Sequence, residues 1–359
     1  MIAKLHSSLA IFTSLGLLAA LAGTAKTLAA TPCMDVLHLF TAADVPEFAP
    51  SEIKCPDRGT KGIVRTGLPG NGLGQHPMLY VGENCNTMFL VTGGKVTWTY
   101  STGTGPEFDD VWMLSNGNIL FSRMAYIAEI TPNKKVVWRY DCHTPNDSKH
   151  TEIHACQPIG LDKVMFVENG LPPKFKIINI KTGVFEVDHE LPFEASRGVH
   201  AQFRRTRVTA QGTYLVPFLG LGYVVEYDKD FKEIWKYKIA QPWAAIRLKN
   251  GNTLITNEKD SLTREVNAKG ETIWEFDCQS DLPAEYKFAS APQSCTRLVN
   301  GNSIFTSRGK NGESPQLIEV TPDKKVVWVL QDWKTLGDAT AVQILDDPGI
   351  PEVPGDSEH

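Results

Sequence analysis

Short apolar runs recur along the chain, and residues typical of turns separate them. One phrase, in which two such runs flank an Asn-Gly turn, occurs three times, as MLSNGNILFS (113–122), RLKNGNTLIT (247–256) and RLVNGNSIFT (297–306). Asn-Gly between strand-like runs is the strongest local signal for a β-hairpin. Because no segment shows sustained helical periodicity, the pattern predicts an all-β protein.

A second phrase follows the hairpins and consists of a turn and then a strand-like run with Trp in a fixed place. It contains Trp98, Trp138, Trp235, Trp274 and Trp328, and we expect each indole to pack between neighbouring units. Each unit therefore has four short strands. The first strands begin near Asp109, His154, His200, Trp243, Gln293 and Thr340, at spacings of 43–50 residues. Four strands with this period are typical of a β-propeller blade.

The first and last units are each incomplete. Residues 338–345 look like a first strand with nothing after it, and residues 78–100 look like the three strands that it lacks. Joining them closes the ring and removes two exposed sheet edges, which predicts six blades over residues 77–346. A seventh blade is the alternative, if residues 35–75 contain strands instead of belonging to an N-terminal extension at 31–76. We expect residues 347–359, which are rich in Pro and acidic residues, to form a flexible tail.

Residues 1–30 have a basic start, a short apolar run and a small-residue exit, which together predict a secretory signal peptide. The apolar run is too short for a comfortable membrane span. We therefore expect an exported protein, periplasmic or extracellular, with no membrane span in the mature chain. A formal net charge of −5 and the absence of basic runs argue against a nucleic-acid partner. The sequence leaves the oligomeric state open.

The chain has seven cysteines, an odd number, in a setting where disulfides persist. We expect bonds between Cys142 and Cys156 and between Cys278 and Cys295, each of which would connect one blade to the next. A Cys33–Cys55 bond would close the N-terminal extension. Cys85 would then remain free.

The repeat endings GGKVTW and NKKVVW resemble those of quinoprotein (PQQ-like) propellers. The whole unit, with its NGN turns and a His at the head of the first strand, is similar to bacterial arylsulfotransferase-type propellers over roughly residues 78–345. PQQ dehydrogenases have eight blades and an adjacent Cys pair that stacks on the quinone. Neither is present here, so PQQ is not expected as a cofactor. Arylsulfotransferases use a channel His to accept the sulfuryl group, but they are longer and carry an additional N-terminal domain.

The first strand of each blade lines the central channel, so polar residues near its start should meet at one channel mouth, where a ligand would bind. The predicted ligand-binding residues are Asp109, Asp110, Glu152, Gln202, Arg205, Trp243, Gln293 and Thr340. The predicted catalytic residues are His154, His200 and Arg204. The alternative is that these residues only line a water-filled channel.

Four functions remain open for this mouth. His154 or His200 could act as nucleophile or general base in sulfuryl transfer or acidic-sugar elimination, with Arg204 or Arg205 on the anionic group. The mouth could instead be a receptor for a carbohydrate or aryl ester that stacks on Trp243. His150, Glu152 and His154 could hold a divalent metal, Zn or Mn. Residues 142–153 and 278–292 could form a protein-interaction platform. We prefer binding of a small polar or anionic ligand.

Overall fold

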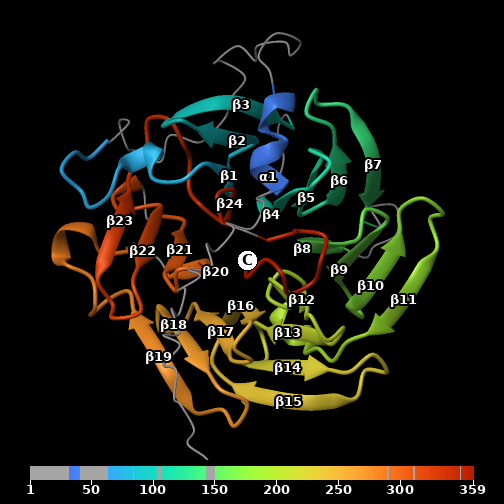
Figure 1. Ribbon diagram of the computed structural model, residues 1–359. Coiled ribbons are helices and arrows are strands. Elements are labelled where there is room, and N and C mark those ends of the chain that lie inside the picture. The colour runs from blue at the N-terminus through green and yellow to red at the C-terminus, as the bar shows by residue number, and fades with distance from the viewer. Residues whose placement is uncertain are drawn as a thin grey trace, which may run out of the picture. The chain divides into compact units, whose positions relative to one another are not determined.

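The computed structural model describes residues 32–40, 64–83, 85–102, 107–142, 150–288, 291–309, 312–347 and 349–359. These residues form six four-stranded antiparallel sheets, arranged as blades around a central channel (Figure 1). The predicted six-bladed β-propeller is confirmed, and the described residues contain no seventh blade. The predicted signal peptide lies outside the described residues.

In every blade the first strand lies next to the channel and the other three follow outward, each paired with its neighbour (Figure 1). Blade 1 contains β24 (Ala341–Ile344), β1 (Met78–Val81), β2 (Thr87–Thr92) and β3 (Lys95–Ser101). Blade 2 contains β4 (Phe108–Met113), β5 (Ile119–Arg123), β6 (Tyr126–Ile130) and β7 (Val136–Asp141). Blade 3 contains β8 (Glu152–Ile159), β9 (Lys163–Asn169), β10 (Lys174–Asn179) and β11 (Phe185–Glu190).

The other three blades have the same order. Blade 4 contains β12 (Arg207–Val208), β13 (Tyr214–Phe218), β14 (Tyr223–Tyr227) and β15 (Glu233–Lys238). Blade 5 contains β16 (Pro242–Arg247), β17 (Thr253–Asn257), β18 (Leu262–Val266) and β19 (Thr272–Asp277). Blade 6 contains β20 (Pro292–Arg297), β21 (Ser303–Ser307), β22 (Leu317–Val320) and β23 (Val326–Leu330). The helices are short: α1 (Pro32–Asp35), η1 (Leu37–Leu39), η4 (Gly72–Gly74), η5 (Ala195–Arg197) and η6 (Ala284–Tyr286).

The ring closes where the sequence predicts. β24 pairs antiparallel with β1, with Met78 opposite Ile344 and Tyr80 opposite Val342. The pairing continues past the strand end, because the Leu345 N–H donates to the Pro77 carbonyl at 3.0 Å. Strand pairing between the two ends of the chain thus completes blade 1, and no sheet edge remains open at the junction.

The three NGN segments form the predicted turns, and each central Gly has a positive φ of 84–90°. The second Asn of each segment has a further role, since its side chain donates to a Glu on the third strand of the same blade. The pairs are Asn118–Glu129, Asn252–Glu265 and Asn302–Glu319, at 2.6–2.7 Å. The phrase therefore fixes the third strand as well as the hairpin.

The repeated Trp residues join neighbouring blades. Trp98, Trp235 and Trp274 donate their indole N–H to backbone carbonyls in the outer turn of the next blade, at 2.8–3.1 Å. Trp328, in the last blade, donates to the Gly72 carbonyl just before β1, at 2.9 Å. Trp138 packs in the apolar cluster between blades 2 and 3. The predicted structural role of these residues is confirmed.

Residues 349–359 pack against the ring, whereas the composition predicts a flexible tail. Glu352 is buried, and its carboxylate accepts hydrogen bonds from the Ser115 N–H and hydroxyl at 2.6 and 2.8 Å. The His359 carbonyl accepts a hydrogen bond from Arg207 Nε at 2.9 Å. The C-terminus lies at the centre of the ring (Figure 1), and the contacts of the tail lie where the inner strands end. The tail therefore covers one end of the channel.

The cysteine predictions are wrong. Five cysteines are buried free thiols: Cys33, Cys142, Cys156, Cys278 and Cys295. All three predicted bonds require at least one of these thiols. Cys85, which we expected to be free, is disulfide-bonded. The free thiols lie within apolar clusters between blades and act there as small apolar side chains.

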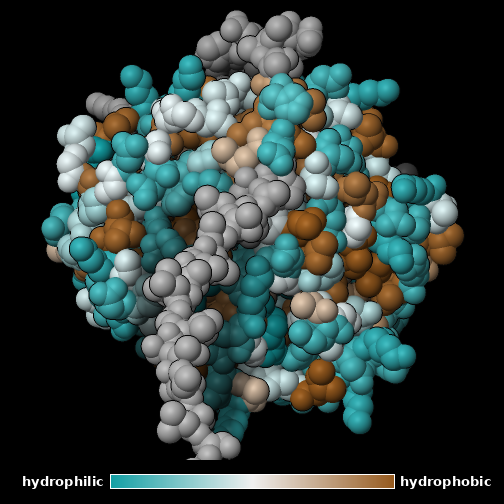
Figure 2. Space-filling model, viewed as in Figure 1, coloured by the Kyte–Doolittle hydropathy of each residue, from teal (hydrophilic) through white to brown (hydrophobic). Residues whose placement is uncertain are grey.

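Polar and apolar side chains are interspersed over the face shown in Figure 2. Large exposed apolar residues occur on the outermost strands, for example Val137 on β7, Ile234 on β15 and Ile273 on β19. Among the described residues, no helix has the length and apolar character needed to cross a bilayer.

Candidate functional site

The end of the channel where the inner strands begin opens into a cavity of about 380 Å³. Its walls come from the segment before β12 and from the starts and second-strand ends of blades 4 to 6. The lining residues are Arg197, His200, Ala201, Arg204, Leu219, Gly220, Gln241, Trp243, Glu258 and Arg308. His200, Arg204 and Trp243 belong to the predicted site, so the cavity lies where the sequence predicts a ligand.

A chain of hydrogen bonds runs from this cavity into the protein. His200 Nδ1 lies 2.8 Å from Glu152 Oε2, and His154 Nε2 lies 2.9 Å from the same oxygen. Asp109 Oδ2 lies 3.2 Å from His154 Nδ1. The two imidazole rings meet edge to face, with centroids 5.1 Å apart. The side chain of His200 is 55% exposed and that of His154 only 1%, so His200 faces the cavity and His154 lies behind it.

The two histidines differ in protonation. Burial and the nearby Arg204 charge lower the pKa of His154 to about 4, so this imidazole is neutral at pH 7. The hydrogen bond to Glu152 raises the pKa of His200 and favours its imidazolium form. Burial alone would raise the pKa of Glu152, but hydrogen bonds from three imidazoles hold it well below its usual range.

Three carboxylates surround the inner end of this chain. Burial, reinforced by the charge of Glu83, raises the pKa of Asp109 well above its usual range. Burial and the neighbouring Asp109 raise the pKa of Glu107 to about 7. Glu83 accepts hydrogen bonds from Gln293 at 2.8 Å and from Arg308 at 3.0 Å. A neutral Asp109 can donate its proton to His154 Nδ1 while His154 Nε2–H donates to Glu152.

Two guanidinium groups lie over Trp243. Arg204 is 4.7 Å and Arg308 is 5.8 Å from the centroid of its ring. Trp243 itself is only 4% exposed. Because the ring already carries these cations, the structure does not support the predicted stacking of a ligand on Trp243. Its role is to hold Arg204 in the cavity wall.

Asp110 and Arg205 do not reach the cavity, contrary to the prediction. The Asp110 carboxylate pairs with Arg205 at 3.0 Å and with Arg207 at 2.9 Å. All three side chains are buried, and the nearby His359 places them at the end of the channel that the tail covers. Asp109 and Asp110 are consecutive on β4, where the pairing with β5 is irregular, and their carboxylates contact His154 and Arg205, respectively.

Gln293 and Thr340 also lie behind the cavity. Gln293 binds Glu83, and the Thr340 hydroxyl accepts the Glu83 N–H at 2.8 Å, so both position Glu83. Gln202 holds both the N–H and the carbonyl of Gly170, at 2.9 and 2.8 Å. These three residues contact Glu83 or Gly170 and do not line the cavity, and their predicted binding of a ligand stays a prediction.

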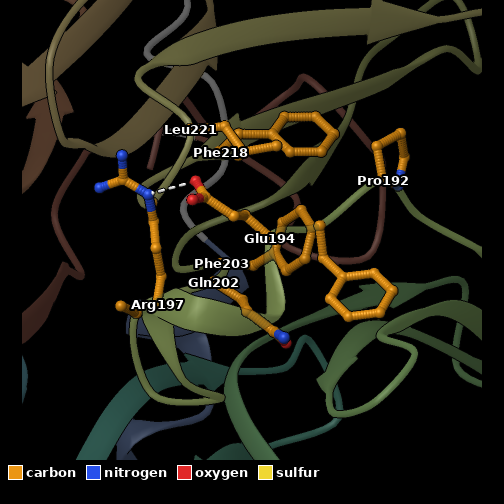
Figure 3. Close-up of a pocket in the computed structure, with 10 residues that line it drawn as sticks. Pro192, Glu194, Arg197, Gln202, Phe203, Phe218 and Leu221 are labelled. Carbon is orange, nitrogen blue, oxygen red and sulfur yellow. Dashed lines mark hydrogen bonds and ion pairs between the residues drawn. The ribbon is translucent and has the colours of Figure 1, made fainter.

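Gln202 also lines a second, smaller pocket with Phe203, Phe218 and Leu221 (Figure 3). The ion pair between Arg197 and Glu194, at 2.7 Å, lies at its edge (Figure 3). Its volume of about 10 Å³ is close to that of a single water probe. This pocket is too small for a substrate.

Within the part of the chain that the structure describes, two groups of side chains have the geometry of metal ligands, and His154 belongs to both. One is Glu152, His154 and His200, and the other is Glu107, Asp109 and His154. The predicted set contains His150, which is instead an exposed residue at the rim that contacts the second oxygen of Glu152. His150 precedes β8, so strand alternation does not place it beside His154.

The sequence prediction missed Glu83, Glu258 and Arg308. Each follows the second strand of its blade, after β1, β17 and β21. The loops after these strands lie at the same end of the ring as the starts of the inner strands. A search for polar residues in these loops could therefore have found Glu83, Glu258 and Arg308. Glu107 was also missed, although it lies two positions before Asp109.

No protein-family model and no curated protein matches the chain. Among solved structures, a protein of unknown function from Bacteroides caccae has a TM-score of 0.66 at 21% identity, over 74% of this chain and 97% of that one. A catalytically inactive virginiamycin B lyase variant from Staphylococcus aureus, solved with quinupristin, has a TM-score of 0.52 at 12% identity, over 80% and 96%. A streptogramin B lyase has a TM-score of 0.50 at 14% identity, over 80% and 85%. At these identities the similarity shows the β-propeller fold alone, and the resemblance to PQQ-like and arylsulfotransferase propellers stays a prediction.

Proposed function

We propose that this propeller is an exported protein that binds a small anionic molecule in the open cavity, with His200 placed to exchange a proton with it. Arg204 carries the proposal. It is 3% exposed and lines the cavity, and its Nε has no hydrogen-bond partner among the described residues. The hydrogen bonds from its NH1 group go to the backbone carbonyls of His200 and Phe203. A buried cation without a carboxylate partner favours an anionic ligand.

The other cations of the cavity are already paired. Arg308 binds Glu83 and Glu258, and Arg197 binds Glu194. The positive charge available to a ligand is therefore that of Arg204. The cavity volume lies in the range of small-molecule sites. A carboxylate of an acidic sugar and the sulfate of an aryl ester both match this charge and size.

His200 has the arrangement of an acid–base residue. Its Nδ1 is held by Glu152, which fixes the ring orientation and leaves Nε2 for the cavity. A carboxylate behind an imidazole plays this orienting role in hydrolases. Both nitrogens of His154 already bind carboxylates. His154 therefore positions Glu152, and His200 is the residue that would transfer a proton.

Three observations support the remaining parts of the proposal. The basic–apolar–small order of residues 1–30 and the disulfide at Cys85 both favour an oxidising compartment outside the cytoplasm.

The catalytically inactive virginiamycin B lyase variant carries a single His-to-Ala change. A propeller of similar architecture can thus depend on one histidine for its chemistry.

Thermal-shift and calorimetric titrations test the binding site. We expect 4-nitrophenyl sulfate or an oligogalacturonide to stabilise the protein, and uncharged analogues of the same size to have no effect. Arg204→Gln should weaken binding at least tenfold, because a hydrogen bond to a charged group contributes about 1.5–3 kcal/mol. Arg139→Gln, at an exposed ion pair on blade 2, is the matched control. Equal affinity of Arg204→Gln and wild type would refute the proposal.

Turnover of the ligand that binds tests His200. With an added phenol or water as acceptor, release of nitrophenolate reports transfer of the sulfuryl group, and ultraviolet absorbance of an unsaturated product reports elimination. We expect His200→Gln to reduce turnover at least 100-fold, as expected for the loss of a general acid or base, and to change Kd much less. A His200→Gln variant with wild-type turnover would exclude His200 as the proton-transfer residue.

A further inference from the structure

We propose that Glu107, Asp109 and His154 form a divalent metal site beside the open cavity, with Glu152 holding His154 from behind. This site goes beyond anion binding and does not depend on the identity of the anionic ligand. It differs from the metal set that the sequence predicts, because it excludes His150 and uses Glu152 only to orient a ligand. Four observations support it.

The first observation is the spacing of the ligand atoms. His154 Nδ1 lies 3.2 Å from Asp109 Oδ2 and 3.8 Å from Glu107 Oε2, and all three atoms lie within 4.8 Å of one another. Nitrogen and oxygen ligands bind a metal such as Zn²⁺ at about 2.1 Å, so neighbouring ligand atoms lie roughly 3.0–3.5 Å apart. The distance from His154 to Asp109 already lies in this range, and the distance from His154 to Glu107 exceeds it by only a few tenths of an ångström.

The second observation is two buried carboxylate oxygens without a hydrogen-bond partner in the described residues. Asp109 is 3% exposed, and its Oδ1 has no hydrogen-bond partner in the described part of the chain. Glu107 Oε2, which lies on the same side as His154, also has none there. Buried polar atoms are almost always partnered, and each exception needs an explanation. A bound cation would supply the missing partner to both carboxylates.

The third observation is the second contact of His154. Its Nε2 lies 2.9 Å from Glu152 Oε2. Metal-binding histidines almost always donate the other ring N–H to a carboxylate or carbonyl, which fixes the tautomer and the ring orientation. With Nε2–H given to Glu152, Nδ1 presents its lone pair to Glu107 and Asp109.

The fourth observation separates the two candidate metal groups. In the group of Glu152, His154 and His200, both imidazoles can donate an N–H to one carboxylate at 2.8–2.9 Å. Its geometry is that of ordinary hydrogen bonds, and it contains no unpartnered buried oxygen in the described residues. The group of Glu107, Asp109 and His154 has two such oxygens. The metal therefore belongs with Asp109.

Two carboxylate oxygens and one imidazole nitrogen favour Mn²⁺ or Zn²⁺, because carboxylates suit Mn²⁺ and imidazole suits Zn²⁺. Three protein ligands leave coordination positions open for water or for a ligand. A cation at this place would add positive charge next to Arg204. The metal site and the anion site would then act on the same molecule.

Metal binding by the full chain tests this inference. The protein is treated with EDTA, exchanged into metal-free buffer and titrated with MnCl₂ or ZnCl₂ in a calorimeter, and metal retained after gel filtration is measured by mass spectrometry. We expect one equivalent per chain. Asp109→Asn should weaken binding at least 100-fold, whereas Asp141→Asn, the matched control at an exposed ion pair on blade 2, should stay within about twofold. These values follow the usual effect of losing one ligand or a distant group.

Two further variants keep the outcome clear. If Asp109→Asn does not fold, as thermal unfolding in EDTA will show, Glu107→Gln replaces it, since the Glu107 side chain is 23% exposed. His200→Gln should retain the metal, and its loss would place the metal in the other group and overturn the inference. Absence of stoichiometric metal in the wild type would also overturn it. Anion binding through Arg204 is measured separately, so either proposal can fail while the other holds.

Discussion

Asp109 and Asp110 are neighbours in the sequence, but their side chains have different surroundings in the structure. Asp109 faces His154, and Asp110 is fully buried between Arg205 and Arg207. The sequence predicts both at the channel mouth, because both stand near the start of an inner strand. Strand alternation separates them, but only the three-dimensional structure shows which of the two faces the site.

The structural role of Asp110 leads to a prediction on stability. Asp110→Asn would leave two buried guanidinium groups without their carboxylate, which costs about 3–5 kcal/mol. Urea unfolding followed by fluorescence measures the loss. Asp188→Asn, at an exposed ion pair with Lys174, is the control and should change the free energy of unfolding by at most about 1 kcal/mol. A similar small change in both variants would mean that Asp110 is not a structural residue.

The residues of the candidate site were predictable to different degrees. Glu152 and His154 could be found because they lie on one strand, where alternation places them on the same face. Glu83 and Arg308 lie 225 positions apart and meet only because the ring closes. Local patterns carry no information about such a pair, although the recurring loop after each second strand indicates where to look.

At the scale of elements, the repeats predict strands well and loops poorly. The NGN turns and the repeated Trp residues occur in the predicted places and make equivalent contacts in several blades. Blade 4 departs from the pattern, because its inner strand is only Arg207–Val208. The period places His200 at the start of this strand, but the residue lies in the preceding loop. The repeat spacing gives only the number of residues between equivalent positions, so it does not distinguish a strand from a loop of the same length.

His76 joins three elements at the closure of the ring and makes it sensitive to pH. Its ring contacts Glu319 on β22 and Asp346 just after β24, at 3.2 and 3.1 Å. Burial alone would lower the pKa of His76, but these hydrogen bonds raise it to about 9. The stabilisation is complete below the unfolded-state pKa of about 6.5 and disappears as pH rises to about 9.

This predicts a pH-dependent difference between wild type and His76→Gln. Between pH 6 and pH 9.5 the wild type should lose about 1–2 kcal/mol more of its free energy of unfolding than the variant, a value reduced for solvent screening. Urea unfolding at both pH values measures it. Parallel losses in the two proteins would show that His76 does not carry this dependence.

At the scale of the whole molecule, the described residues leave one end of the channel open and cover the other with the tail. Removal of residues 349–359 would take away the partners of the Ser115 and Arg297 N–H groups and of Arg207 Nε. Newly exposed groups regain water, so we expect a loss of about 2–4 kcal/mol in the free energy of unfolding. Thermal unfolding of the truncated chain measures it. An unchanged Tm would mean that the tail contributes nothing to the fold.

The composition alone predicts a mobile tail, because the tail is rich in Pro and acidic residues. Composition contains no information on the groups of the ring that bind these residues. Glu352 and Glu358 are acidic, but each accepts backbone hydrogen bonds from the ring. The six-bladed ring itself was predictable, since it follows from a count of repeats and from two complementary incomplete units. The packing of residues 349–359 over one end of the channel was not predictable in this way.

The pairing of β24 with β1 has a consequence for biosynthesis. Because β24, the inner partner of β1, is translated after every strand of blades 2–6, a polypeptide that lacks it cannot complete its first blade. A ribosome that stalls before residue 338 would release a product whose β1 lacks a neighbour, and such species are prone to aggregation and degradation. The order of the strands thus gives the cell a way to distinguish complete molecules from fragments.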